Sequence, residues 1–173
     1  MKTIQNQTFD EERTLYGSRD LQVKNCSFDG PADGESAFKE CSGVEAEHCF
    51  FNLRYPFWHD HGLKFSGSEM TPLCRAALWY SDHVEITDTK LHGIKALREC
   101  SDIKMKTAIS FPRSLAGLQK RGDGGYHSPE RILYDALKAS VLPECGLKGK
   151  YSFQYIENSV FENCTFDTKD AFW

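Results

Sequence analysis

The chain has 173 residues, 40% of them hydrophobic and 27% charged, a composition typical of a globular protein that excludes a disordered chain or a membrane span. Its net charge is -4 and its pI is about 5.9. Phosphate binding requires a basic face, and no block of like charges occurs, so we expect neither nucleic acid nor a membrane as a partner.

The N-terminal segment, MKTIQNQTFDEER, is polar and acidic and contains no apolar run of signal-peptide length. This predicts a cytoplasmic protein. The seven cysteines are odd in number and never form a C-x-x-C pair. Disulfides and a structural zinc site are therefore disfavoured, and we predict no metal and no cofactor.

From residue 21 onward the sequence repeats. An eight-residue pattern, alternating apolar and polar before a bend, occurs in LQVKNCSF (21–28), VEAEHCFF (44–51), LKFSGSEM (63–70) and VEITDTKL (84–91). Further copies begin at Ile103 and Ser159, and the starts up to Ile103 are 19 to 23 residues apart. Period-two alternation in segments this short, closed by Asn, Gly, Asp or His, predicts brief strands.

A second motif stands directly before each copy. Units of 19–23 residues with two or three short strands predict a single-stranded right-handed parallel β-helix, whose coils stack about 4.8 Å apart. A β-sandwich is the less favoured all-β alternative. The second motif reads TLYGSRD (14–20), AFKECSG (37–43), PFWHDHG (56–62), ALWYSDH (77–83), ALRECSD (96–102) and SFQYIEN (152–158).

Stacking of equivalent positions predicts continuous apolar columns inside the helix, in which each large side chain contributes about 1.5–3 kcal/mol. Cysteines at two further positions alternate with Ser and Thr, as small packing residues do. The four predicted apolar columns are Leu21, Val44, Leu63, Val84 and Ile103; Val23, Ala46, Phe65, Ile86 and Met105; Phe28, Phe51, Met70 and Leu91; and Leu15, Phe38, Phe57, Leu78, Leu97 and Phe153.

The repeat divides the chain into β-helix coils over 1–106, a non-repeating segment over 107–146, and a further coil over 147–173 that ends in mid-repeat. The middle segment is either a functional loop with a short helix or a stretch read out of frame, since an offset reading of DNA for 121–137 restores a coil. The last coil would expose an apolar cross-section, so we expect a fragment or self-association at that end.

Four stretches, RYPFWH, RAALWYSD, GIKALREC and DGPADGESAFKE, closely resemble a bacterial domain-of-unknown-function family of single-stranded right-handed β-helices. The resemblance covers 1–106 and 147–173 and implies an architecture similar to that of pectin lyases. It implies no activity. Members of the family are longer, and the segment 107–146 departs from them.

The third position of the second motif adjoins a buried one, so strand alternation should turn it outward. It holds Lys39, Trp58, Trp79 and Arg98. An exposed row of indoles flanked by cations, with Arg54 and Arg75 nearby in sequence, would suit a sugar or oligosaccharide. The alternative is that these long side chains cover the coil, with Arg98 stacked on Trp79.

The fourth position offers weak catalytic candidates, His59, Tyr80 and Glu99, beside Glu40. They could act as general acids or bases if this column faces solvent. Glu40 and Glu99 lie three coils apart, about 14 Å on the strand spacing. The two carboxyl groups of an inverting glycosidase lie about 6.5–9.5 Å apart, so a two-carboxylate glycosidase is disfavoured. A lyase-like base is the remaining catalytic reading.

Two metal readings are disfavoured. His59 and His61 could share a face of the strand, but the only further ligands would be Asp82 or His83 on the next coil. A corner role for His61 beside Asp82 is favoured. The acidic loop 29–35 lacks an ordered set of calcium ligands; its candidates are Asp29, Asp33 and Glu35.

The sequence therefore predicts two alternative functions. The first is binding or modification of carbohydrate on the lateral aromatic and basic face. The second is a non-catalytic scaffold whose flat face binds another protein, with the aromatic residues as anchors.

Overall fold

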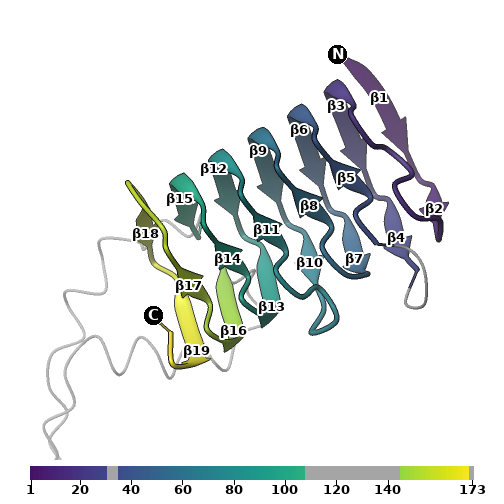
Figure 1. The fold of residues 1–173 in the computed structure, drawn as a ribbon. Coiled ribbons are helices and arrows are strands. Elements are labelled where there is room, and N and C mark those ends of the chain that lie inside the picture. The colour runs from purple at the N-terminus through teal and green to yellow at the C-terminus, as the bar shows by residue number, and fades with distance from the viewer. Residues whose placement is uncertain (31–34, 108–144, 172–173) are drawn as a thin grey trace, which may run out of the picture. The chain divides into compact units, whose positions relative to one another are not determined.

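The computed structural model describes residues 1–30, 35–107 and 145–171. Within these ranges the chain forms strands and no helix, and every strand pair is parallel. Successive coils stack side by side into a β-solenoid of about six turns (Figure 1). The predicted parallel β-helix is confirmed, and the β-sandwich alternative is wrong because its strands would pair antiparallel.

Three sheets form the walls of the described solenoid, and each takes one strand from successive coils. The first sheet contains β1 (Lys2–Gln5), β3 (Arg19–Lys24), β6 (Ser42–Glu47), β9 (His61–Ser66), β12 (Asp82–Thr87), β15 (Ser101–Lys106) and β18 (Val160–Glu162).

The second sheet contains β2 (Thr8–Phe9), β4 (Ser27–Asp29), β7 (Phe50–Asn52), β10 (Glu69–Met70), β13 (Lys90–Ile94), β16 (Gly146–Lys150) and β19 (Thr165–Lys169). The third sheet is the narrowest and contains β5 (Phe38–Lys39), β8 (Phe57–Trp58), β11 (Leu78–Trp79), β14 (Leu97–Arg98) and β17 (Phe153–Gln154).

The strand register reproduces the predicted columns. Leu21 pairs with Val44, Val44 with Leu63, and Leu63 with Val84, and these four side chains are buried. Alternation places the next residue of each strand outside, where charged and polar side chains predominate. The hydrophobic effect thus fixes the register, since a slip of one residue would expose a whole column.

Phenylalanine rings continue the columns through the core. Phe28 stacks on Phe51 with ring centroids 5.1 Å apart, and Phe38 stacks on Phe57 at 4.9 Å. The two stacks meet edge to face, with Phe51 and Phe57 5.2 Å apart at 68°. This arrangement fills the space between the second and third sheets.

The interior corners explain the exchange of Cys, Ser and Thr. At one corner the backbone N–H of Cys49 donates to Ser68 Oγ at 3.1 Å, and that of Ser68 donates to Thr89 Oγ1 at 3.3 Å. The Cys49 thiol instead donates to the carbonyl oxygen of Val23, at 3.5 Å. A corner residue must therefore be small and able to form a hydrogen bond.

The interruption of the repeat falls within one coil. The chain leaves β15 at Thr107 and re-enters at Cys145, whose backbone N–H donates to Thr107 Oγ1 at 2.9 Å. β16 then pairs with β13 and β19. The two readings of the segment 107–146 depend on residues 108–144, which lie outside the described residues; Gly146 at its end already belongs to β16.

Candidate functional site

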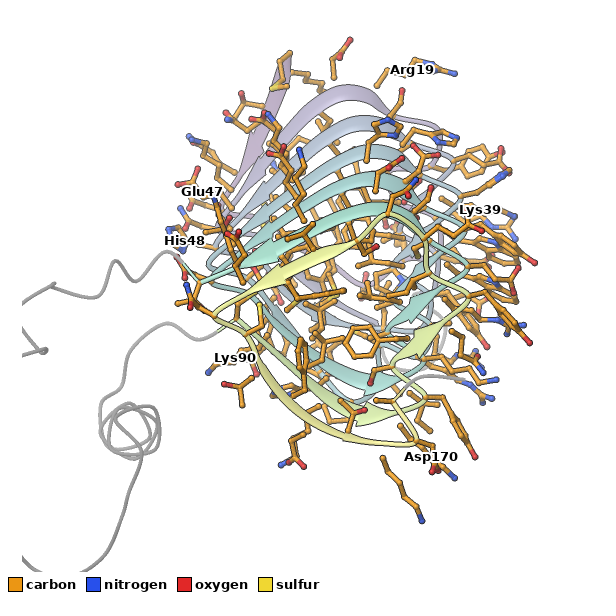
Figure 2. The ribbon with its side chains drawn as sticks, turned by 90° about the vertical axis from the view of Figure 1, so that its left-hand side faces the viewer. Arg19, Lys39, Glu47, His48, Lys90 and Asp170 are labelled. Carbon is orange, nitrogen blue, oxygen red and sulfur yellow. The ribbon has the colours of Figure 1, made fainter. Side chains whose placement is uncertain are left out.

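Four of the predicted binding residues stack on the outer surface of the third sheet. Lys39 pairs with Trp58, Trp58 with Trp79, and Trp79 with Arg98. All four side chains are half-buried. We call these four residues the ladder. Lys39 projects on the side of the coil opposite His48 (Figure 2).

Within the ladder the planar groups stack along the solenoid. The Trp58 and Trp79 ring centroids are 5.0 Å apart with 9° between the planes. Lys39 Nζ lies 4.4 Å from the Trp58 ring centroid, and Arg98 Cζ lies 4.4 Å from that of Trp79. Each indole therefore has one face against the other indole and the second face under a cation. The exposed parts of these half-buried rings are therefore along their edges, except at Trp79 Nε1, which is buried.

The two cations of the ladder are also paired with carboxylates. Lys39 Nζ lies 3.9 Å from Glu40 Oε1, and Arg98 Nε lies 3.0 Å from Glu99 Oε1. These pairs offset the charge that an anionic ligand would need.

The two other predicted cations differ. Arg54 Nη2 lies 3.2 Å from Glu35 Oε2. Arg75 is exposed, and among the described residues its side chain makes no ion pair or hydrogen bond.

The catalytic candidates occupy the corner between the third and first sheets. His59, Tyr80 and Glu99 have φ values of 65°, 54° and 52°. This left-handed conformation turns the chain and lets two successive side chains, at the third and fourth positions, lie outside. It is uncommon for residues of this size, and it meets the condition stated for the catalytic candidates, that their column faces solvent.

Tyr80 extends the aromatic surface beyond the ladder. Its ring stacks on Trp79 with centroids 5.4 Å apart, and the ring of His59 lies 6.3 Å away. Tyr80 is 43% exposed. The structure thus brings the ladder, His59, Tyr80 and Glu99 together on one surface.

The electrostatics at Tyr80 and Glu99 do not favour proton transfer by these two residues near neutral pH. A hydrogen bond with Glu99 raises the pKa of Tyr80, and the same bond lowers the pKa of Glu99. Tyr16 donates to Glu40 Oε2 at 2.6 Å, and this bond raises the pKa of Tyr16. A general acid or base works best with a pKa close to the working pH. These shifts move the pKa values of the tyrosines and of Glu99 further from neutral pH.

The predicted corner position of His61 is confirmed by its pairing with Asp82. His61 Nδ1 lies 2.6 Å from Asp82 Oδ2, and His83 Nδ1 lies 2.7 Å from Asp82 Oδ1. Burial raises the pKa of Asp82, but the hydrogen bonds from His83 and His61 outweigh it and lower the pKa.

In the part of the chain that the structure describes, no group of three or more His, Cys, Asp or Glu side chains is placed to hold a metal ion. Of the three calcium-loop candidates, Asp33 lies outside the described residues.

Asp60 is an unexpected feature of the interior. Its side chain is fully buried in the corner column between Cys41 and Ser81. Oδ1 accepts a hydrogen bond from the Cys41 backbone N–H at 2.6 Å, and Oδ2 has no partner in the described structure. Burial raises the pKa of Asp60 to about 8. The signal was available at the fifth position of the second motif, which reads Cys41, Asp60, Ser81 and Cys100.

A surface depression of about 230 Å³ lies elsewhere, on the outer surface of the first sheet. Glu45, Glu47 and Lys64 line it, and Lys64 Nζ lies 3.5 Å from Glu45 Oε1. Glu47 projects on the opposite side of the coil from Lys39 (Figure 2). The depression therefore includes none of the predicted binding residues, and its charges are largely paired.

Stacked parallel coils define a β-solenoid, a class of repeat protein in which each repeat packs on its neighbours. The chain belongs to the family described as protein of unknown function (DUF3737), whose model matches residues 2–115. Neither a curated protein nor a solved structure matches the chain. Residues 147–173, which also resemble the family in sequence, lie beyond the residues that the family model matches.

The described residues also contain no helix that is long and apolar enough to cross a membrane.

Proposed function

We propose that the protein is a non-catalytic recognition solenoid that binds a protein partner over the ladder and the adjoining corner. The observation that carries this proposal is the closed stack of the ladder. Both faces of Trp58 and of Trp79 are covered, and the flanking Lys39 and Arg98 are paired with carboxylates. A sugar ring needs an open aromatic face, whereas a protein surface can pack against ring edges.

The exposed aromatic rings beside the ladder support the same proposal. Tyr80 and Tyr155 occupy equivalent corners and are 43% and 67% exposed, and Tyr16, at the third motif position of the first coil, is 50% exposed. Tyrosine is enriched in the energetic centres of protein interfaces because it combines a large apolar area with a hydroxyl group. The ladder is held in place by its own contacts, so a partner would dock on a preorganised surface.

A photo-crosslinking experiment tests the proposal. A photoreactive phenylalanine analogue replaces Tyr80, and the tagged protein is irradiated in cells of its source. We expect a discrete protein adduct that is lost when His59→Ala and Trp58→Ala are added. The matched control carries the analogue at Phe50, which is 36% exposed on the second sheet. Absence of an adduct at position 80, or the same adducts from both positions, would refute the proposal.

Carbohydrate binding is the second candidate, and Arg75 favours it as a cation without a partner among the described residues. In this case a pectin-lyase-like architecture would present Tyr80 and the ring edges, instead of an indole face, to the glycan. Tryptophan fluorescence with acidic and neutral oligosaccharides separates the candidates. Quenching that disappears in Tyr80→Ala and Arg75→Ala would support the glycan. No quenching with any oligosaccharide would exclude it.

Two further proposals concern the state of the protein. A cytoplasmic location is supported by the seven free cysteines, since disulfides are uncommon in that compartment. Self-association at the C-terminal coil is supported by Val160 and Phe166, which are 53% and 45% exposed. Light scattering over a range of concentrations tests the second proposal, and Phe166→Glu should shift the equilibrium to the monomer.

A further inference from the structure

Cys145 and Cys164 occupy the same corner of two successive coils. Cys145 directly precedes β16 and Cys164 directly precedes β19, and these strands pair with Gly146 opposite Thr165. The backbone N–H of Thr165 donates to the Cys145 carbonyl oxygen at 3.1 Å. Neighbouring strands lie about 4.8 Å apart, which is within the Cα separation of about 4.4–6.8 Å that a disulfide requires.

Their thiols interact, and this interaction lowers the pKa of Cys145 and raises the pKa of Cys164. The Cys164 thiol also donates to the carbonyl oxygens of Met105 and Glu162, at 3.5 and 3.3 Å. Cys26 and Cys49 occupy the same corner of two earlier coils and form a natural comparison. Their thiols donate to the carbonyl oxygens of Lys24 and Glu47, at 3.3 and 3.4 Å, as the Cys164 thiol does to that of Glu162.

Access also differs between the two pairs. Cys164 lies on the last described coil and is partly exposed, whereas Cys145 is 1% exposed. Cys26 and Cys49 are each 2% exposed. A small oxidant therefore reaches one thiol of the C-terminal pair directly and neither thiol of the other pair.

We propose that Cys145 and Cys164 form a reversible dithiol–disulfide couple that is oxidised by peroxides. Because the pKa of Cys145 is lowered, its thiolate takes the Cys164 proton as the Cys164 sulfur attacks one peroxide oxygen and the O–O bond breaks. This leaves a Cys164 sulfenic acid and a hydroxide, and the hydroxide removes the proton from Cys145 to form the first water. The Cys145 thiolate then attacks the Cys164 sulfur, and the departing hydroxide leaves as a second water. Two thiols and one hydrogen peroxide thus give one disulfide and two waters.

The disulfide would join the last two described coils covalently through a short loop. This is a site of modification that is independent of the ladder, which lies on a different sheet. A reversible disulfide at this site is compatible with a reducing compartment, because thiol reductants would restore both thiols.

Peptide mapping of the full chain tests the proposal. The folded protein is treated with hydrogen peroxide, alkylated and digested with trypsin without reduction. We expect a cross-linked product of the peptides 139–148 and 151–169, which hold Cys145 and Cys164. The product should disappear with dithiothreitol and should be absent from Cys164→Ser. The Cys26→Ser variant should give it in unchanged yield.

Three outcomes would overturn the proposal. The first is the absence of the cross-link in wild-type protein at peroxide doses that oxidise Cys164 to the sulfinic acid. The second is a cross-link between Cys26 and Cys49 that forms as fast. The third is a cross-link that forms only after denaturation, which would show that the folded register does not bring the thiols together.

Discussion

Replacing the buried Asp60 by serine should stabilise the protein, and the gain should grow with pH. Asp60 stands in a column where other coils have Cys or Ser, and its Oδ2 atom lacks a hydrogen-bond partner. A serine keeps an oxygen that can accept from the Cys41 backbone N–H, as Ser81 Oγ accepts from the Asp60 N–H at 3.4 Å. It also removes a group that ionises.

The pKa of Asp60 sets the magnitude. Burial raises it from 3.8 to about 8 in the folded protein. Below pH 3.8 both the folded and unfolded states hold the proton, so there is no penalty. As the pH rises, the unfolded state releases the proton first, and folding loses about 1.4 kcal/mol per pH unit up to the folded pKa. At pH 7 the loss is on the order of 4 kcal/mol, and structural relaxation makes this an upper bound.

Urea denaturation at pH 4 and pH 8 measures the effect. Asp60→Ser leaves a small cavity, so we expect a change of less than about 1 kcal/mol at pH 4 and a gain of about 2–4 kcal/mol at pH 8. Asp10→Ser, at an exposed position, is the matched control and should show no such difference. An equal effect of Asp60→Ser at the two pH values would refute the reasoning, because the penalty would then not come from ionisation.

Three other substitutions test the packing and the corner charges. Gly149→Ala should lower the free energy of unfolding by about 3 kcal/mol, because the added Cβ would collide with the Gly93 carbonyl oxygen. Gly146→Ala is the control in the same denaturation assay. It should be tolerated, because its Cβ would lie 3.4 Å from the Thr165 carbonyl oxygen. Phe51→Ala should cost about 3–5 kcal/mol, while Phe50→Ala next to it should cost less than about 1 kcal/mol, because Phe51 is fully buried and Phe50 is 36% exposed. Equal losses in either pair would contradict the register. Asp82→Asn should lower the pKa of His83 in an NMR titration, since the hydrogen bond that His83 donates to Asp82 raises that pKa. That contact stabilises the fold below pH 6.5, and the contribution is lost as the pH rises through the raised pKa.

The columns were predictable because each coil repeats the same physical requirement. Val44 and Leu63 pair in the structure because both occupy the first apolar position of an alternating segment. Alternation decides which face is buried, and the period decides which residues stack. The interruption at Thr107 was visible for the same reason, since the alternation stops there.

Asp60 was not predictable from its neighbours. In the sequence HDH it reads as one of three polar residues, and aspartate is seldom buried. Its column, however, requires a side chain that satisfies the Cys41 backbone N–H, and the carboxylate does so at 2.6 Å. Alignment of whole coils, rather than local composition, is what identifies such a residue.

The sequence also indicated that Trp58 and Trp79 lie outside, but not how the rings are turned. Equivalent residues in adjacent coils are held at the strand spacing of about 4.8 Å, which is close to the 5.0 Å between these ring centroids. Identical rings in register therefore stack on each other along the axis and bury their faces. An aromatic residue on a parallel solenoid keeps an open face only where no side chain at that position in an adjacent coil stacks on its ring.

By this criterion Tyr80 is the residue on this surface whose role decides between the two proposed functions. The coil before Tyr80 holds His59, and the coil after it holds Glu99. The Tyr80 hydroxyl group forms a hydrogen bond with Glu99. The Tyr80 ring stacks on Trp79, and the residue remains 43% exposed. A glycan that stacks on an aromatic face would have to use Tyr80, whereas a protein partner would bury Tyr80 together with the edges of the ladder. Loss of binding in Tyr80→Ala with full retention in Trp58→Phe is thus expected for a sugar, and partial losses in both are expected for a protein.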